Sequence, residues 1–127
     1  QLEMKYYRDV LCPAVESGEV TYFELQKKYE LQPKYTHNGK TVLPIIYVAD
    51  FYMEYADGHI EVVDTKGCPD SVAKLKRKLF WYIYPDIDYR WITYVQKWGG
   101  WLEYEVVKEL RKEAKRSKNK KEEPDNG

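Results

Sequence analysis

The fold of this chain is decided by residues 47–67, which read YVADFYMEYADGHIEVVDTKG. Residues 45–55 and 59–66 are rich in β-branched and aromatic side chains, a composition typical of strands. Between them, Ala56-Asp57-Gly58 combines residues that favour a tight turn. The stretch therefore predicts a β-hairpin.

The length of the hairpin loop sets which residues face each other. Glycine at its third position favours a three-residue loop, because that position takes a left-handed conformation. Such a loop pairs Tyr55 with His59 and places Asp50 opposite Asp64. A two-residue turn would move Asp64 to the other face, since a shift of one residue inverts a strand. The three-residue loop is therefore part of the prediction.

With this register, one face of the hairpin carries charges where a sheet usually buries apolar side chains. Asp50, Asp64 and Lys66 share that face. Its other members are Tyr52, Glu54, Ile60 and Val62. Buried charges are costly unless they bind something or pair with each other. The alternatives are a sheet edge open to water and a simple Asp–Lys pair; we interpret the cluster as a candidate site.

Helices and further strands are expected on either side of the hairpin. Apolar periodicity and capping signals predict helices over residues 1–16, 71–84 and 101–118, strands over 20–32 (as one strand or two) and 88–95, and a turn over 37–40. The order is then α-β-β-β-α-β-α. That order is typical of an α/β fold in which helices flank a mixed β-sheet.

At 127 residues the chain is long enough for one domain with its own core. We expect this domain over residues 1–110 and a basic, partly disordered tail over 111–127, with disorder from residue 119 onward. Cys12 and Cys68 do not form a CxxC pair, which fits a reducing cytoplasm with both as small core residues. We expect no membrane span and no signal peptide.

The first helix brings one more acid toward the hairpin. At 100° per residue, Glu3 falls in line with the apolar stripe of that helix. The stripe consists of Tyr6, Tyr7, Val10, Leu11 and Ala14. The alternative interpretation is a first-turn Glu favoured by the helix dipole. Glu24 and Gln26 are further polar residues that could line the site, but the strand pattern of residues 20–32 does not place either of them on the face of Asp50 and Asp64.

The second helix contributes basic residues. Its predicted buried stripe is Val72, Leu75, Leu79 and Ile83, with Lys76 inside it. Lys76 either reaches the site or extends from the edge of the stripe into water. The solvent side carries Lys74, Arg77 and Lys78.

The residue types on the hairpin face suit metal-assisted phosphodiester chemistry. The carboxylates of Asp and Glu are the hard ligands that Mg²⁺ or Mn²⁺ prefers, and the carbonyl of Thr65 is a further candidate ligand. Lys66, two residues from Asp64, is suited to orient an attacking water and to offset developing charge. We expect Glu3, Asp50, Asp64 and Lys66 to converge, with Lys76 a more remote candidate.

Charge is distributed unevenly, although 21 basic and 21 acidic residues give a formal net charge of zero. Seven basic residues and one acid lie between positions 111 and 121, and four basic residues lie between 74 and 78. Such runs are either solvated surface or contacts to a phosphate backbone. As DNA contacts we predict Lys74, Lys76, Arg77, Lys78, Arg111, Lys115 and Arg116. The chain begins at Gln1, not Met, and we expect a preceding segment.

Asp50 and Asp64-Thr-Lys66, with Glu3 upstream on a helix, resemble the PD-(D/E)XK nuclease superfamily. Within it the chain is similar to a small family of phage-encoded proteins of formerly unassigned function. The matching segments are residues 2–7, 30–35, 47–52, 57–58, 63–67 and 75–80. Ala49 replaces the proline that begins the superfamily's motif, and Asp64 replaces the commoner Glu.

The resemblance implies a restriction-endonuclease-like core and a metal-dependent, structure-specific DNA endonuclease. Such a hydrolase, similar to phage and archaeal Holliday junction resolvases and to end-cutting transposon nucleases, would cut branched DNA during recombination as a homodimer. Glu3, Asp50 and Asp64 would be its metal ligands and Lys66 its catalytic lysine. It would act in the cytoplasm of a bacterial host, as a phage or prophage protein.

Other functions remain open at this stage. Within the same class, the alternative is a restriction-like or replication-fork nuclease that cuts duplex DNA. From another class, the alternatives are a non-catalytic phage DNA-binding protein on the same fold and a protein-interaction module that displays tryptophans. Shape recognition relies on contacts to the DNA backbone, so the sequence carries no base-reading pattern that separates them.

Overall fold

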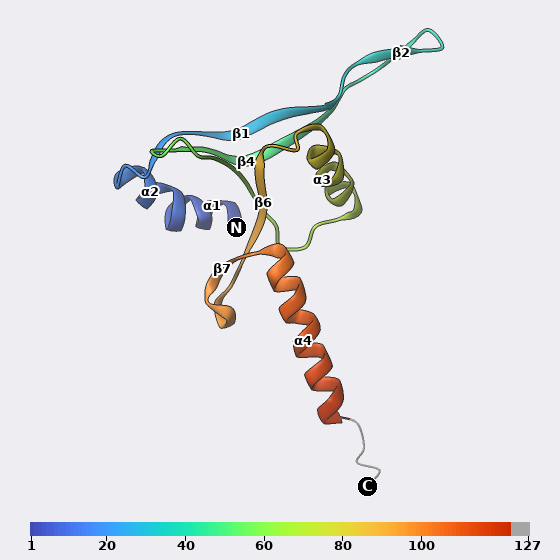
Figure 1. The fold of residues 1–127 in the computed structure, drawn as a ribbon. Coiled ribbons are helices and arrows are strands. Elements are labelled where there is room, and N and C mark those ends of the chain that lie inside the picture. The colour runs from blue at the N-terminus through green and yellow to red at the C-terminus, as the bar shows by residue number, and fades with distance from the viewer. Residues whose placement is uncertain (123–127) are drawn as a thin grey trace.

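The computed structural model describes residues 1–122 (Figure 1). In chain order, its elements are α1 (Leu2–Tyr6), the π-helical turn η1 (Tyr7–Leu11), α2 (Cys12–Glu16), β1 (Val20–Gln32), β2 (Tyr35–His37), β3 (Lys40–Val42), β4 (Ile45–Tyr55), β5 (Ile60–Thr65), α3 (Ser71–Ile83), β6 (Asp88–Val95), the 3₁₀ turn η2 (Gln96–Trp98), β7 (Gly100–Glu103) and α4 (Tyr104–Glu122). The first three form one continuous N-terminal helix.

A five-stranded sheet with the order β1-β4-β5-β6-β7 forms the centre of the molecule. Strands β5 and β6 run parallel and α3 connects them, whereas the other neighbours are antiparallel. Parallel neighbours require a crossover connection, and the chain supplies it with a helix capped by Asp70, whose side chain accepts from the Ala73 amide at 2.8 Å. The predicted α/β class with a mixed sheet is confirmed.

The predicted three-residue hairpin loop is also confirmed. The Tyr55 amide donates to the His59 carbonyl at 2.8 Å. Gly58 adopts the left-handed φ of 91° that this loop requires. The pairing of Phe51 with Val63 continues this register, so Asp50 and Asp64 follow as the next opposed residues.

Helices cover both faces of the sheet and create two apolar clusters. Val62 packs in a cluster with Phe80 of α3, whereas its neighbour Val63 packs with Tyr6 and Leu11 of the N-terminal helix. Because successive strand residues point to opposite faces, the two helices lie on opposite sides of the sheet. The predicted stripe of the first helix is confirmed at its buried residues.

The predicted buried stripe of α3 is wrong at three of its four residues, whereas the fourth, Leu79, is partly buried and packs against the core. Val72 and Leu75 are 58% and 59% exposed, and Ile83 is also exposed. The fully buried residue is Phe80, whose ring packs against those of Tyr29, Tyr47, Tyr84 and Tyr89. The tyrosine rings of β1, β4 and β6 pack more closely on one large aromatic ring than on a row of aliphatic side chains. Helix α3 is therefore rotated so that Phe80, and not the predicted stripe, faces the sheet.

The C-terminal part differs from the prediction in two ways. Residues 100–103 form the edge strand β7, where the start of a helix was expected, and α4 begins only at Tyr104. Residues 119–122 continue α4, although disorder was predicted from 119 onward. The rest of that prediction, residues 123–127, lies outside the described part of the chain. None of the described helices has the length and apolar character needed to cross a bilayer.

Two further differences concern exposed features. The predicted turn at 37–40 is the tip of a small separate hairpin formed by β2 and β3, which the sequence did not predict. Its strands have only three residues each, too few for a period-two pattern to be recognised. Cys68 is exposed and Cys12 half-buried, so the expectation of two core cysteines is wrong.

Candidate active site

Asp50 and Asp64 lie where β4 and β5 separate. Direct pairing of the two strands ends at Phe51 and Val63. Beyond that point the Asp50 amide donates to Asp64 Oδ1 at 2.8 Å, and the amide and hydroxyl of Thr65 both donate to Asp50 Oδ2 at 3.0 Å. Each aspartate side chain thus replaces a missing strand-to-strand hydrogen bond, which fixes both carboxylates in the gap.

Asp64 is an almost fully buried acid, with 1% of its surface exposed. Its Oδ2 accepts a hydrogen bond from the Tyr47 hydroxyl and lies 3.3 Å from Lys66 Nζ. Burial and the neighbouring charge of Asp50 raise the pKa of Asp64, while Tyr47 and Lys66 oppose that rise. The carboxylate is therefore held in place at an electrostatic cost.

Glu3 extends from α1 toward the same carboxylates. Its Oε1 accepts a hydrogen bond from the side-chain amide of Gln26, which fixes its direction. Partial burial and the charges of Asp50 and Asp64 raise the pKa of Glu3. The structure thus brings together the three acids and the lysine that the sequence singled out.

Gln26 belongs to this cluster as well, although the sequence did not place it there. It lies in β1 between the paired residues Leu25 and Lys27, opposite Asp50, and has a positive φ of 55°. A left-handed residue is rare inside a strand. This local distortion, together with the hydrogen bond to Glu3, ties the first helix to the site.

Lys66 lines a hollow of about 270 Å³ between β4 and the start of α3, and none of the three acids is among its lining residues. Its amide donates to the Ile92 carbonyl at 2.8 Å, and its ammonium lies 5.5 Å from the centre of the Trp91 ring. Lys76 lines the same hollow, and its Nζ donates to the Ile46 carbonyl at 3.0 Å. Lys76 therefore borders the site, but its hydrogen bond is to the backbone of β4 and not to an acid.

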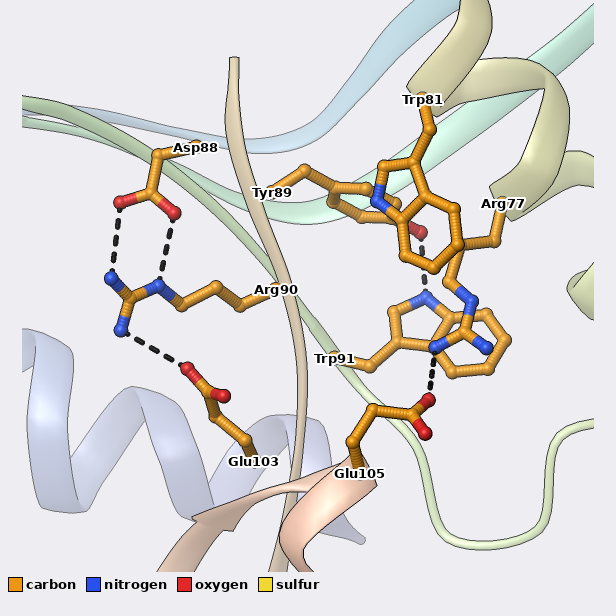
Figure 2. A pocket seen from close by; sticks show the side chains of 8 residues that line it. All are labelled: Arg77, Trp81, Asp88, Tyr89, Arg90, Trp91, Glu103 and Glu105. Atoms are coloured by element: carbon orange, nitrogen blue, oxygen red, sulfur yellow. Dashed lines mark hydrogen bonds and ion pairs between the residues drawn. The ribbon is translucent and has the colours of Figure 1, made fainter. Parts of the chain in front are cut away.

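Behind Asp64, a chain of buried hydrogen bonds continues into the core. Trp91 Nε1 donates to the Tyr89 hydroxyl at 2.6 Å, and that hydroxyl donates to the Tyr47 hydroxyl at 2.7 Å. The Tyr47 hydroxyl then donates to Asp64. The first of these bonds is drawn in Figure 2. The sequence did not identify this chain, because a buried tyrosine in a strand resembles ordinary core.

Removing the Tyr47 hydroxyl should destabilise the protein. Tyr47→Phe keeps the ring but removes one hydrogen bond to the buried Asp64 and leaves the Tyr89 hydroxyl without an acceptor for its proton, which costs about 1–3 kcal/mol. Urea unfolding measures the difference. Tyr52→Phe is the control, because the Tyr52 hydroxyl donates to the half-exposed Glu54 and its loss should change stability by less than about 0.5 kcal/mol. Equal losses would contradict a buried network around Asp64.

On the far side of Trp91 lies a pocket of about 300 Å³ whose charged residues are already paired (Figure 2). Arg77 lies 3.9 Å from the Trp91 ring and 4.6 Å from that of Trp81, and it bonds Glu105 at 2.8 Å. Its side chain is only 15% exposed. The prediction that Arg77 faces solvent is wrong, and we withdraw it as a DNA contact.

Of the other predicted DNA contacts, Lys76 is half-buried and the remaining five are exposed. Lys74 and Lys78 lie on the outer side of α3, and Arg111, Lys115 and Arg116 lie on α4. Figure 1 shows α4 extending away from the sheet. These side chains are accessible to a large polyanion.

The acids can accept a hard cation. Within the described residues, Asp50 Oδ1 and Glu3 Oε2 receive no hydrogen bond. Thr65 donates to Asp50 through its amide and its hydroxyl, so the Thr65 carbonyl takes no part in these hydrogen bonds. Oxygen donors of this kind suit Mg²⁺ or Mn²⁺. However, the ligand atoms of Glu3, Asp50 and Asp64 do not all lie within 4.8 Å of one another, so at least one side chain must close in on a shared ion.

One other group in the described residues does meet that distance. It consists of His59, Glu61 and Asp88, far from Lys66 in the strand register. Arg90 lies 2.9 Å from Asp88 and 3.6 Å from Glu61, and His59 Nε2 lies 3.0 Å from Asp88. A guanidinium thus already neutralises these acids, and we do not interpret them as a metal site.

A protein-family model described as "Protein of unknown function (DUF1064)" matches residues 1–100. The chain belongs to this family. The DUF1064 match includes Glu3, Gln26, Tyr47, Asp50, Asp64 and Lys66 and ends before α4. The whole acidic cluster thus lies in the part of the chain that defines the family. No curated protein matches the chain.

Proposed function

We propose that the protein is a metal-dependent, structure-specific DNA endonuclease that hydrolyses phosphodiester bonds in branched DNA. The observation that carries the proposal is the placement of Asp50 and Asp64 in the gap between two separating strands, with Lys66 Nζ 3.3 Å from Asp64. This arrangement is consistent with the resemblance to PD-(D/E)XK nucleases. Restriction-endonuclease-like topology is part of the proposal.

The three acids act as the cation-binding group. Asp50 and Asp64 offer oxygens held by backbone hydrogen bonds, and Glu3 of α1, held by Gln26, adds a third carboxylate. These carboxylates would hold a Mg²⁺, which would supply an activated water and offset the charge that develops on the scissile phosphate. Burial and the charges of the neighbouring acids raise the pKa of both Glu3 and Asp64, so a dication that offsets this penalty is favoured there.

Lys66 acts on the attacking water and on the phosphate. Its ammonium lies 3.3 Å from Asp64 Oδ2 and its side chain lines the hollow beside β4, so it can hold a water near a phosphate that enters from solvent. Its positive charge also stabilises the transition state. The aromatic ring of Trp91 restricts where the lysine can move.

Exposed basic residues hold the nucleic acid. Lys74, Lys78 and the basic residues of α4 contact phosphates, which makes affinity strongly dependent on salt. Two copies of the protein place two sites at a fixed spacing, as symmetric cleavage of a junction requires. The homodimer is therefore part of the proposal.

A substrate panel tests the proposal. The protein is incubated with an end-labelled four-way junction, a linear duplex and a single strand of the same sequences, in Mg²⁺ or in EDTA. We expect metal-dependent paired nicks in the junction only. Cleavage of the duplex at equal rate would favour a restriction-like nuclease, and binding without cutting in Mg²⁺ and Mn²⁺ would favour a non-catalytic DNA-binding protein.

The raised pKa values predict how stability depends on pH and metal. Glu3 and Asp64 have pKa values raised above their ordinary values, so without metal their contribution to stability is present at lower pH and is lost as pH rises through the raised values. A cation removes that penalty. Thermal unfolding should show a Mg²⁺-induced rise in Tm that is larger at pH 8 than at pH 4. A rise independent of pH would contradict this prediction.

A further inference from the structure

The hairpin of β2 and β3, which we call the ribbon (residues 33–44), projects beyond the main sheet. Figure 1 shows it extending past β1 and β4 at the end of the molecule. It forms a separate two-stranded sheet, in which Tyr35 pairs with Val42 and His37 with Lys40. Asn38 and Gly39 have φ values of 50° and 74°, as a two-residue type I′ turn requires. The ribbon is therefore a preformed projection.

The direction of the ribbon is fixed where it leaves the sheet. The register between β1 and β4 shifts between Glu30 and Gln32, which marks a bulge that bends the strand. Pro33 and Pro44 then flank the ribbon and restrict its backbone. A stiff projection loses little conformational entropy on binding, which favours a role in gripping a partner.

The ribbon is exposed and free of negative charge. The strand residues are exposed apart from Val42, and Leu43 beside them is 74% exposed. No Asp or Glu occurs from residue 31 to residue 49, although these types make up 21 of the 127 residues. By strand alternation, His37 and Lys40 lie on one face, and Thr36 and Thr41 lie on the other. Both faces thus present positive or polar groups to a partner.

We propose that the ribbon grips the backbone of duplex DNA next to the site of cleavage. This inference rests on the proposed function, because it assigns the ribbon to the same substrate. A two-stranded ribbon has the dimensions of the major groove. Its lysines, with no acid nearby, match a polyanion. A second copy of the ribbon fits less well, because lysines and prolines at a strand edge oppose pairing with another strand.

The chain geometry limits how far the ribbon reaches. Asn38 at the tip and Asp50 in the site are joined by strand residues, and twelve residues at about 3.4 Å each span roughly 40 Å at most. One turn of duplex DNA is about 34–36 Å long. The ribbon therefore contacts phosphates no further than about one helical turn from the scissile bond.

Charge-matched variants test the ribbon. The variant Lys34→Ala/Lys40→Ala removes two charges from it, and Arg8→Ala/Lys97→Ala removes two exposed charges elsewhere. Affinity for a junction is measured by fluorescence anisotropy across a salt series. We expect the ribbon variant to lower the slope of log K against log salt by about two and to weaken binding roughly tenfold or more at low salt. We expect the control to bind as the wild type does, and both variants to keep the wild-type Tm.

The length of the DNA arms gives a second readout. With junction arms of about 20 base pairs the ribbon variant should bind more weakly than the control, and with arms well below one turn, about 6 base pairs, that difference should shrink. Equal affinity of the two variants on long arms, or a wild type that binds no duplex, would overturn the inference. So would sedimentation showing that the ribbon variant loses only self-association.

The two proposals fail separately. If the wild type binds DNA through the ribbon but cuts no substrate in Mg²⁺ or Mn²⁺, the proposed function is wrong and the ribbon keeps its role as a DNA contact. If cleavage is metal-dependent and the ribbon variant matches the control in affinity and salt slope, the nuclease proposal stands and the ribbon inference is wrong.

Discussion

Lys66→Ala should reduce the rate of junction cleavage by about 10²–10⁴-fold under single-turnover conditions, while the affinity for DNA stays within about twofold. The lysine lies next to Asp64 and lines the hollow beside β4, so its loss removes the group that orients water and offsets charge. Asp50→Asn should cost at least about 10³-fold, because water activation and phosphate neutralisation are lost together.

Lys76→Ala is the matched control for Lys66→Ala. It removes an ammonium from the same hollow, but one that bonds the Ile46 carbonyl and not an acid. We expect its cleavage rate to fall much less than that of Lys66→Ala. Cleavage that survives Asp50→Asn and Lys66→Ala would contradict the site, and an equal loss in both lysine variants would contradict the role given to Lys66.

Phe80→Ala should lower the free energy of unfolding by about 3–5 kcal/mol, the largest stability effect expected in this chain. Its ring is fully buried, and its centre lies 4.4 Å from that of Tyr89 and 5.0 Å from that of Tyr29. Truncation leaves a cavity between α3 and strands β1, β4 and β6, and these elements cannot move closely enough together to fill it. Urea unfolding followed by circular dichroism measures the loss.

Leu75→Ala is the control for this prediction, because Leu75 is 59% exposed on the same helix. Its truncation should cost less than about 1 kcal/mol. If Phe80→Ala does not fold at all, Phe80→Leu, which leaves a smaller cavity, should still be less stable than Leu75→Ala. A larger loss at Leu75 would mean that α3 packs through the stripe expected from its sequence.

The hairpin at the site was predictable because local chemistry determines it. Gly58 supplies the left-handed loop position, that loop sets the register, and the register alone places Asp50 opposite Asp64. Helical phase then brought Glu3 toward the same residues. The parallel pairing of β5 and β6 also followed from the sequence, since a helix of this length between two strands is typical of a crossover.

Features that depend on distant partners were not predictable. Two faces of α3 carry large apolar residues at helical spacing, and only the tyrosines of β1, β4 and β6 select the face of Phe80. Tyr47 resembles any core tyrosine until the register brings its hydroxyl to Asp64. Gln26 enters the site through a left-handed backbone conformation for which its residue type gives no signal.

The most direct test of the account is a time course of nicking on a four-way junction labelled on each strand in turn, resolved on a denaturing gel in Mg²⁺ and in EDTA. For the wild type, the account predicts paired nicks near the branch point that need Mg²⁺ and that are absent with Asp50→Asn. Intact strands in Mg²⁺ and Mn²⁺ at saturating wild-type protein, or nicks that persist in EDTA, would contradict it.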